Sequence, residues 1–218
     1  MLIKVTESLA RTIYDDEDDI ELYAYGLQIF LSNVLELLFV VVLGLCIGRL
    51  FETIAFLGAF ITLRTGAGGY HAKTFFRCFL GLLFVYGLHL AILSLTPVYW
   101  IYYLCLLLMV ISIFPILKYA PVADPNKPIG PIQRKCFRKR SVVVFLIQAA
   151  IIVAMCGFGI AAANLGIYIA DTIQYVLLSF VIGLATASGS VVAARIQNAR
   201  GRANYDCQDD HALSSLLN

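Results

Sequence analysis

The feature that most constrains the fold is a series of long apolar runs that contain very few charged side chains. About 20 residues of α-helix are needed to cross the roughly 30 Å hydrocarbon core of a bilayer. Of the 218 residues, 61% are hydrophobic and 14% are charged, whereas soluble domains have about 25% charged residues. Membrane-spanning strands would alternate polar and apolar side chains, and these runs do not. The sequence therefore predicts an all-α integral membrane protein.

Six apolar runs predict six transmembrane helices, at residues 27–47, 50–63, 75–95, 98–117, 141–163 and 167–187. An apolar stripe near the N-terminus predicts an amphipathic helix before them. The predicted organisation is a single membrane domain over residues 1–218. Its parts are the amphipathic N-terminal segment, the six-helix bundle, a basic cytoplasmic loop and a polar C-terminal tail: residues 1–25, 27–190, 118–140 and 195–218.

The distribution of Lys and Arg predicts the orientation of these helices. Residues 118–140 hold seven cations and one acidic residue, Asp124. Cytoplasmic loops of membrane proteins carry an excess of Lys and Arg. With this loop in the cytoplasm, Arg64, Lys73 and Arg77 lie on the same side, and only Arg49 lies outside. We therefore expect a multi-pass cell-membrane protein with both termini in the cytoplasm.

A glycine-rich segment between two apolar runs, from Arg64 to Cys78, holds the candidate catalytic residues. It contains His71 and Cys78, and a thiolate nucleophile with an imidazole base is a common catalytic pair. On one continuous helix these two residues would lie roughly 10 Å apart along the axis, too far for direct proton transfer. If they act together, the chain must fold back at the glycines, which include Gly69.

Other polar residues have two interpretations each. Arg64 either orients a substrate or reaches to the membrane surface, and Gln28 either orients His71 or packs between helices. Glu36 is costly to bury, and its partner cannot be identified from the sequence. His89, deep in the third run, is interpreted as a packing or hydrogen-bonding residue. The basic loop, with Lys127, Arg134 and Lys135, binds either an acidic peptide or anionic lipid. The six cysteines show no metal-ligand or CxxC spacing, so no metal, cofactor or disulfide is expected.

Two motifs in order resemble the AgrB family (accessory gene regulator B). The first runs from Arg64 to Cys78 and includes Gly69-Tyr70-His71, and the second runs from Lys118 to Ile129 with a basic continuation. A weaker match leads from Gly26-Leu27-Gln28 to Asn33. Together with the number of spans, the resemblance covers about residues 20–190. The sequence departs from the family at 126–128, where Asn-Lys-Pro stands in place of a run of lysines.

This resemblance implies a membrane cysteine endopeptidase of a Gram-positive quorum-sensing system. Such an enzyme removes the acidic C-terminal tail of a small AgrD-like propeptide and helps to close it into a cyclic autoinducing peptide. The resemblance implies His71 and Cys78 as the catalytic pair and Arg64 and Gly69 as supporting residues. Gln28 is kept beside them as the candidate that orients His71. Lys73, Lys127, Arg134 and Lys135 are the expected substrate-binding cations. The ring can be a thiolactone or a lactone.

Two functions without covalent chemistry remain as alternatives. A small transporter would also have six spans and a glycine-broken segment at the membrane face. A membrane scaffold would bind lipid through the basic loop. Membrane lipids and the propeptide are the expected partners, a homodimer is left open, and no nucleic-acid partner is expected.

Overall fold

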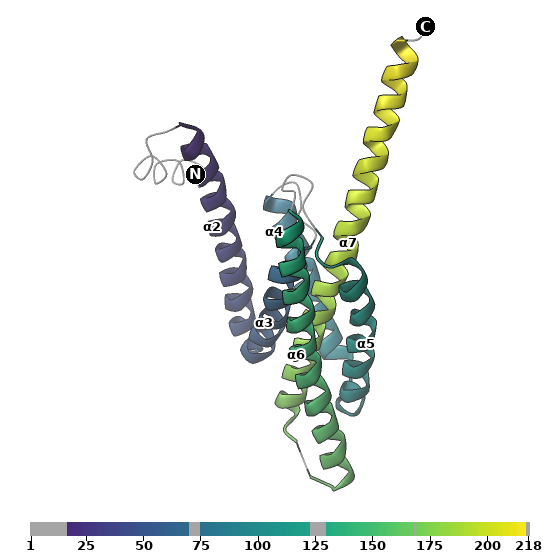
Figure 1. Ribbon diagram of the computed structural model, residues 1–218. Coiled ribbons are helices and arrows are strands. Elements are labelled where there is room, and N and C mark those ends of the chain that lie inside the picture. Colours follow the sequence, from purple (N-terminus) through teal and green to yellow (C-terminus); the bar gives the residue numbers. More distant parts are fainter. Residues whose placement is uncertain (1–16, 70–74, 123–129, 168, 217–218) are drawn as a thin grey trace.

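The computed structural model describes residues 17–69, 75–122, 130–167 and 169–216. In these ranges the chain is almost entirely helical and forms no strand (Figure 1). The helices are α2 (Glu17–Cys46), α3 (Leu50–Ala67), α4 (Phe75–Leu95), the short 3-10 helix η1 (Val98–Trp100), α5 (Ile101–Tyr119), α6 (Pro131–Asn164) and α7 (Asp171–Leu216).

The prediction of an all-α membrane protein is confirmed. Five of the described helices are long and apolar enough to cross a membrane, and α2 contains a shorter apolar helix, Phe30–Cys46. Large hydrophobic side chains such as Phe84 and Phe158 are exposed on the outside of the helices. In water these side chains would be costly, but in a bilayer they face lipid tails.

Several helices extend beyond the apolar runs that predicted them. Helix α6 begins at Pro131, so the basic residues from Arg134 to Arg140 lie on a helix and not in the expected loop. Helix α7 continues to Leu216 through the expected tail, and α2 is already helical at Glu17. An apolar run marks where a helix crosses the membrane. Lys, Arg and Gln are good helix formers in water, so the backbone stays helical past that boundary.

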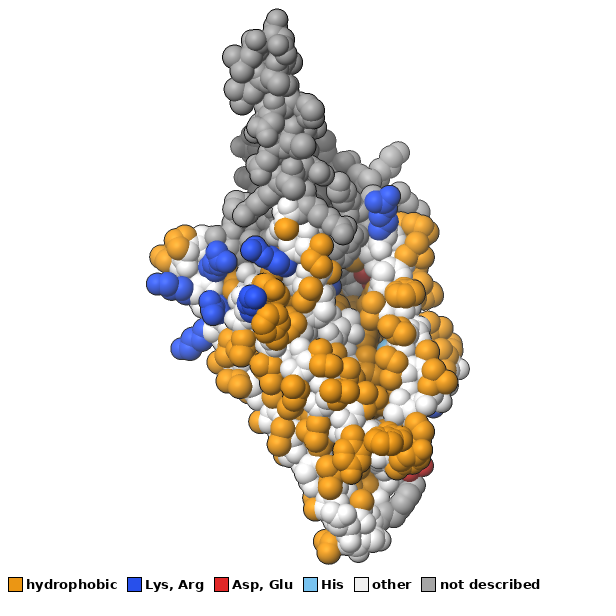
Figure 2. Space-filling model, turned by 90° about the vertical axis from the view of Figure 1, so that its right-hand side faces the viewer, with side chains coloured by type: hydrophobic (Ala, Val, Ile, Leu, Met, Phe, Trp, Pro, Cys, Tyr) orange, Lys and Arg blue, Asp and Glu red, His pale blue; other side chains and the backbone are white. Residues whose placement is uncertain are grey.

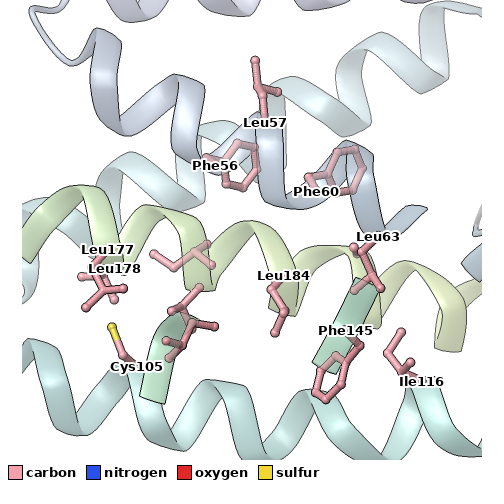
Figure 3. Packing of buried hydrophobic residues seen from close by; sticks show 14 of the residues in the cluster. Phe56, Leu57, Phe60, Leu63, Cys105, Ile116, Phe145, Leu177, Leu178 and Leu184 are labelled. Carbon is pink, nitrogen blue, oxygen red and sulfur yellow. The ribbon is translucent and has the colours of Figure 1, made fainter. Parts of the chain in front are cut away.

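The centre of the molecule is α7, which packs extensively against α3 and α5, while α6 packs against both of those helices. Figure 3 shows buried side chains from these four helices meeting, among them Phe56 and Leu63 of α3, Phe145 of α6 and Leu184 of α7. Helices α2 and α4 have fewer contacts and lie at the edge of this core.

Basic side chains gather at one end of the molecule. Helix α2 begins there, α3 ends there, and α4 and α6 begin there (Figure 1). Figure 2 shows Lys and Arg gathered toward this end above a largely hydrophobic surface. We call it the basic end, and its exposed cations include Arg77, Lys118, Arg134, Lys135, Arg138, Lys139, Arg140 and Arg195. Which end faces the cytoplasm stays a prediction.

Candidate functional site

The glycine-rich segment ends α3 at the basic end. Gly68 has a φ of 73°, a conformation that side chains with a Cβ rarely adopt, and its N–H donates to the Arg64 carbonyl at 3.0 Å. Gly68 also pairs with Val122 in a parallel bridge, and the Val122 N–H donates to the Ala67 carbonyl at 3.1 Å. The helix therefore breaks at the glycines, and the two sequence motifs meet in space.

Close packing, and not backbone conformation, explains the two neighbouring glycines. A Cβ on Gly69 would collide with the hydroxyl of Ser190 on α7. A Cβ on Gly66 would lie 3.1 Å from Oγ and 3.2 Å from the backbone N of Ser141 on α6. The segment is thus held between α6, α7 and the chain that follows α5. The positive φ lies at Gly68 and not at Gly69.

Cys78 lies in the first turn of α4, close to where the sequence places it, and is half-buried. It is a free thiol, as are Cys46, Cys105, Cys136 and Cys156. The carboxylate of Glu36 on α2 interacts electrostatically with this thiol. The charge of Arg64, from the last turn of α3, acts on both groups. Three helices thus bring Glu36, Arg64 and Cys78 together.

Arg64 is held at this place by an aromatic ring as well as by charge. Its guanidinium carbon lies 5.3 Å from the ring centroid of Phe60, one turn earlier on α3. A cation over an aromatic face is attracted by the negative electrostatic potential of the ring. The side chain is half-buried and does not simply extend into solvent. Arg64 therefore packs against Phe60 at the end of α3, and its role toward a substrate stays a prediction.

Glu36 is the site residue that the sequence did not assign. Its side chain is 5% exposed, and Oε1 has no hydrogen-bond partner among the described residues. Asn33, one turn earlier on α2, is exposed. The sequence feature that could have identified Glu36 is a carboxylate within an apolar run, because ionisable groups inside membranes are costly and are usually functional.

Several expected site residues cannot be placed. His71, Lys73 and Lys127 lie outside the described residues. Gln28 is on α2, but its side chain also lies outside the described part of the structure. The pairing of His71 with Cys78 therefore stays a prediction, as do the roles of Gln28, Lys73 and Lys127.

The basic-loop cations that lie on α6 form an exposed helical surface next to this site. Arg134 and Lys135 lie on the first turns of α6 and are exposed. Further along the same helix, Nη2 of Arg140 donates to Oγ1 of Thr65 at 3.5 Å. Thr65 is the neighbour of Arg64 at the end of α3. The basic surface of α6 therefore adjoins the helix end that carries Arg64.

A cluster of polar and aromatic contacts attaches the C-terminal half of α4 to α3 and α7. The Nε2 atom of His89 lies 2.9 Å from Oγ of Ser179 on α7, and the imidazole stacks on Phe56 of α3 at 4.7 Å. The hydroxyl groups of Tyr86 and Thr53 are 2.7 Å apart. The interpretation of His89 as a packing and hydrogen-bonding residue agrees with these contacts. In the described ranges, no three His, Cys, Asp or Glu side chains are placed to hold a metal ion.

Comparisons with known proteins point to one family. Residues 3–186 match the family model described as accessory gene regulator B. The chain is 30% identical over 124 residues to Protein FsrB of Enterococcus faecalis, covering 55% of this chain and 49% of that protein. It is 28% identical over 134 residues to the accessory gene regulator protein B of Staphylococcus intermedius, covering 58% of this chain and 66% of that protein. The matches thus span about half to two thirds of these relatives. No solved structure matches the chain.

Proposed function

Because the chain belongs to the accessory gene regulator B family, we propose that it is a membrane cysteine endopeptidase of a quorum-sensing system. Cys78 is the nucleophile and His71 is the base. The substrate is a small AgrD-like propeptide whose acidic C-terminal tail is removed. The remaining peptide is then closed into a thiolactone or lactone ring.

The position of Cys78 is the observation that carries this proposal. It is a free, half-buried thiol in the first turn of a helix, beside Arg64. Burial of the sulfur and the charge of Glu36 oppose a thiolate at Cys78, whereas the neighbouring Arg64 guanidinium and the N-terminal turn of the helix favour it. The thiol also lies at the basic end, where an acidic peptide tail would be attracted. Cys46, Cys105, Cys136 and Cys156 lack this combination of surroundings.

The proposed reaction consists of two acyl transfers. The Cys78 thiolate attacks a propeptide carbonyl, the C–N bond breaks, and the departing amine takes a proton from His71. This step leaves the peptide bound to Cys78 as a thioester. A thiol or hydroxyl of the same peptide then attacks this thioester, gives its proton to the base, and releases the Cys78 thiolate. Transfer to a thiol exchanges one thioester for another, so it needs little free energy.

The exposed surface of α6 provides the binding site for the tail in this proposal. Arg134 and Lys135 begin the row of cations, and Arg140 ends it beside α3. An acidic tail bound along this surface would place the preceding peptide bond near the end of α3, where Arg64 lies. Charge attraction of this kind also speeds the encounter between enzyme and substrate.

Mass spectrometry of a reaction in lipid tests the proposal. The substrate is a synthetic AgrD-like propeptide with an amphipathic leader, a Cys- or Ser-containing core and an acidic tail. Wild-type protein should release the tail and form an acyl adduct that hydroxylamine removes. Cys78→Ala should abolish both, and His71→Ala should suppress the adduct. The matched control is Cys136→Ala, an exposed cysteine on α6 whose loss should leave both unchanged.

Two outcomes would contradict the proposal. Full cleavage by Cys78→Ala would exclude this cysteine as the nucleophile. An unchanged propeptide with folded wild-type protein would instead favour the transporter or scaffold functions.

A further inference from the structure

The side chain of Glu36 is a buried carboxylate in the apolar part of α2. Its exposure is 5%, and Oε1 finds no hydrogen-bond partner within the described residues. Carboxylates at such positions are costly and are retained mainly where they serve a function. Its electrostatic neighbours are the Cys78 thiol and the Arg64 guanidinium. Its environment is therefore the cysteine site itself.

Packing fixes the position of Glu36 relative to α4. One turn further along α2, the ring of Phe39 meets the ring of Phe79 edge to face, with centroids 5.3 Å apart. Phe79 directly follows Cys78 in the sequence. Val40, four residues after Glu36, is fully buried. These apolar contacts hold the two helices in a register that places the carboxylate against the thiol.

The weak packing around Cys78 means that a polar contact is needed to hold its thiol in one orientation. The first turn of α4 is largely exposed, with Phe76 at 64% exposure, and the well-buried residues of this helix lie further along, at Tyr86, His89 and Leu93. Without a polar contact near its start, the thiol could adopt several rotamers. A hydrogen bond to a buried acceptor selects one of them and holds it beside Arg64.

We infer that Glu36 is a positioning residue of the cysteine site, holding the Cys78 thiol beside Arg64 through its carboxylate. This inference rests on the proposed function for its role in acyl transfer. The contact itself does not depend on the identity of the substrate. Because the carboxylate adds negative charge next to sulfur, Glu36 also restrains the nucleophile of the resting enzyme, and Arg64 opposes that effect.

Two substitutions separate positioning from packing. Glu36→Gln keeps an oxygen that can accept a hydrogen bond from the thiol but removes the charge. Glu36→Leu removes both and suits an apolar surrounding. If Glu36 only filled space, Leu would serve at least as well as Gln. The matched control is Glu52→Gln, which changes a carboxylate of 6% exposure that is paired with Arg49 at 3.3 Å, near the opposite end of α3.

The first measurement needs no propeptide. In a protein with Cys46, Cys136 and Cys207 changed to Ser, the rate of Cys78 alkylation by iodoacetamide at pH 7 is followed by peptide mass spectrometry. Removing the negative charge beside sulfur should raise this rate at least about threefold in both Glu36 variants. Glu52→Gln should leave it within about twofold. This measurement stands even if the proposed substrate is wrong.

The second measurement is the rate of acyl-adduct formation with the propeptide. Glu36→Gln should stay within about fivefold of the parent, and Glu36→Leu should fall at least about thirtyfold, since a misplaced reacting group can cost about a hundredfold. Melting temperatures in detergent check that both variants fold. Unchanged alkylation in both variants, or acylation by the Leu variant as fast as by the Gln variant, would overturn the inference.

Discussion

The core of α3, α5, α6 and α7 and the edge pair of α2 and α4 are held together in different ways. In α7, 56% of the 18-residue apolar window is buried inside the protein, whereas in α4 the corresponding share is 17%. The core depends on close contact, as where Gly183 of α7 lies against the backbone of Phe56. The edge pair depends on a few specific contacts, including Tyr86 with Thr53 and His89 with Ser179.

This difference has a consequence for the proposed chemistry. The thiol of Cys78 lies on the weakly packed helix, whereas Arg64 comes from the well-packed one. Core contacts should therefore control folding, and edge contacts should control the relative position of the reacting groups. Substitutions in the two regions should therefore separate stability from activity.

The largest effect is expected in the core. At Gly183, an alanine Cβ would collide with the carbonyl oxygen of Phe56, so Gly183→Ala should cost about 1–3 kcal/mol of stability. Gly189 lies two turns later on α7 with no atom within 4 Å of such a Cβ, so Gly189→Ala should stabilise by about 0.5–1 kcal/mol. Thermal melting in detergent measures both. Equal melting temperatures would mean that α3 and α7 are not in close contact.

A substitution in the glycine-rich segment should lower activity, and a second substitution on α7 should restore it. Gly69→Ala places a Cβ against the hydroxyl of Ser190, and the resulting shift should lower cleavage about tenfold, since small displacements at a site are costly. Gly69→Val should lower it further. Adding Ser190→Ala to Gly69→Ala removes the colliding oxygen and should restore most of the cleavage rate. Failure of this rescue would argue against close packing as the reason for glycine.

Loss of the hydrogen bond between Tyr86, in the C-terminal half of α4, and Thr53 should have a smaller effect. Tyr86→Phe keeps the ring and removes the hydroxyl that lies 2.7 Å from Oγ1 of Thr53. Hydrogen bonds between membrane helices contribute about 0.6 kcal/mol on average, so the melting temperature should fall slightly. Cleavage should fall a few-fold as α4 moves. The control is Tyr103→Phe, at a ring of 58% exposure, which should change neither quantity.

The smallest effect on stability is expected on the basic surface of α6. Reversing the charges at Arg134 and Lys135, together with Lys127, should weaken propeptide binding and leave the melting temperature unchanged, because the two α6 side chains are exposed. The loss should shrink with added salt, since exposed charges are screened over about 8 Å at physiological ionic strength. An equal loss with an uncharged-tail propeptide would indicate lipid binding or folding instead.

Much of the architecture could be predicted from local sequence patterns. Apolar runs identified the helices because each must be long and apolar enough for a bilayer, and Gly66 to Gly69 marked the break between α3 and α4. The helix ends were less accessible. Lys and Arg favour helix as well as loop, so the start of α6 at Pro131 was not visible in the composition.

The sequence by itself determined the helical membrane class, the break after α3, and Cys78 and Arg64 as candidate site residues. These follow from composition and local spacing, which need no knowledge of distant contacts. Only the tertiary structure decided that Glu36 meets Cys78, that Val122 pairs with Gly68, and that Ser190 requires a glycine at position 69. Each of these depends on how helices distant in sequence pack together, and no local pattern encodes that register.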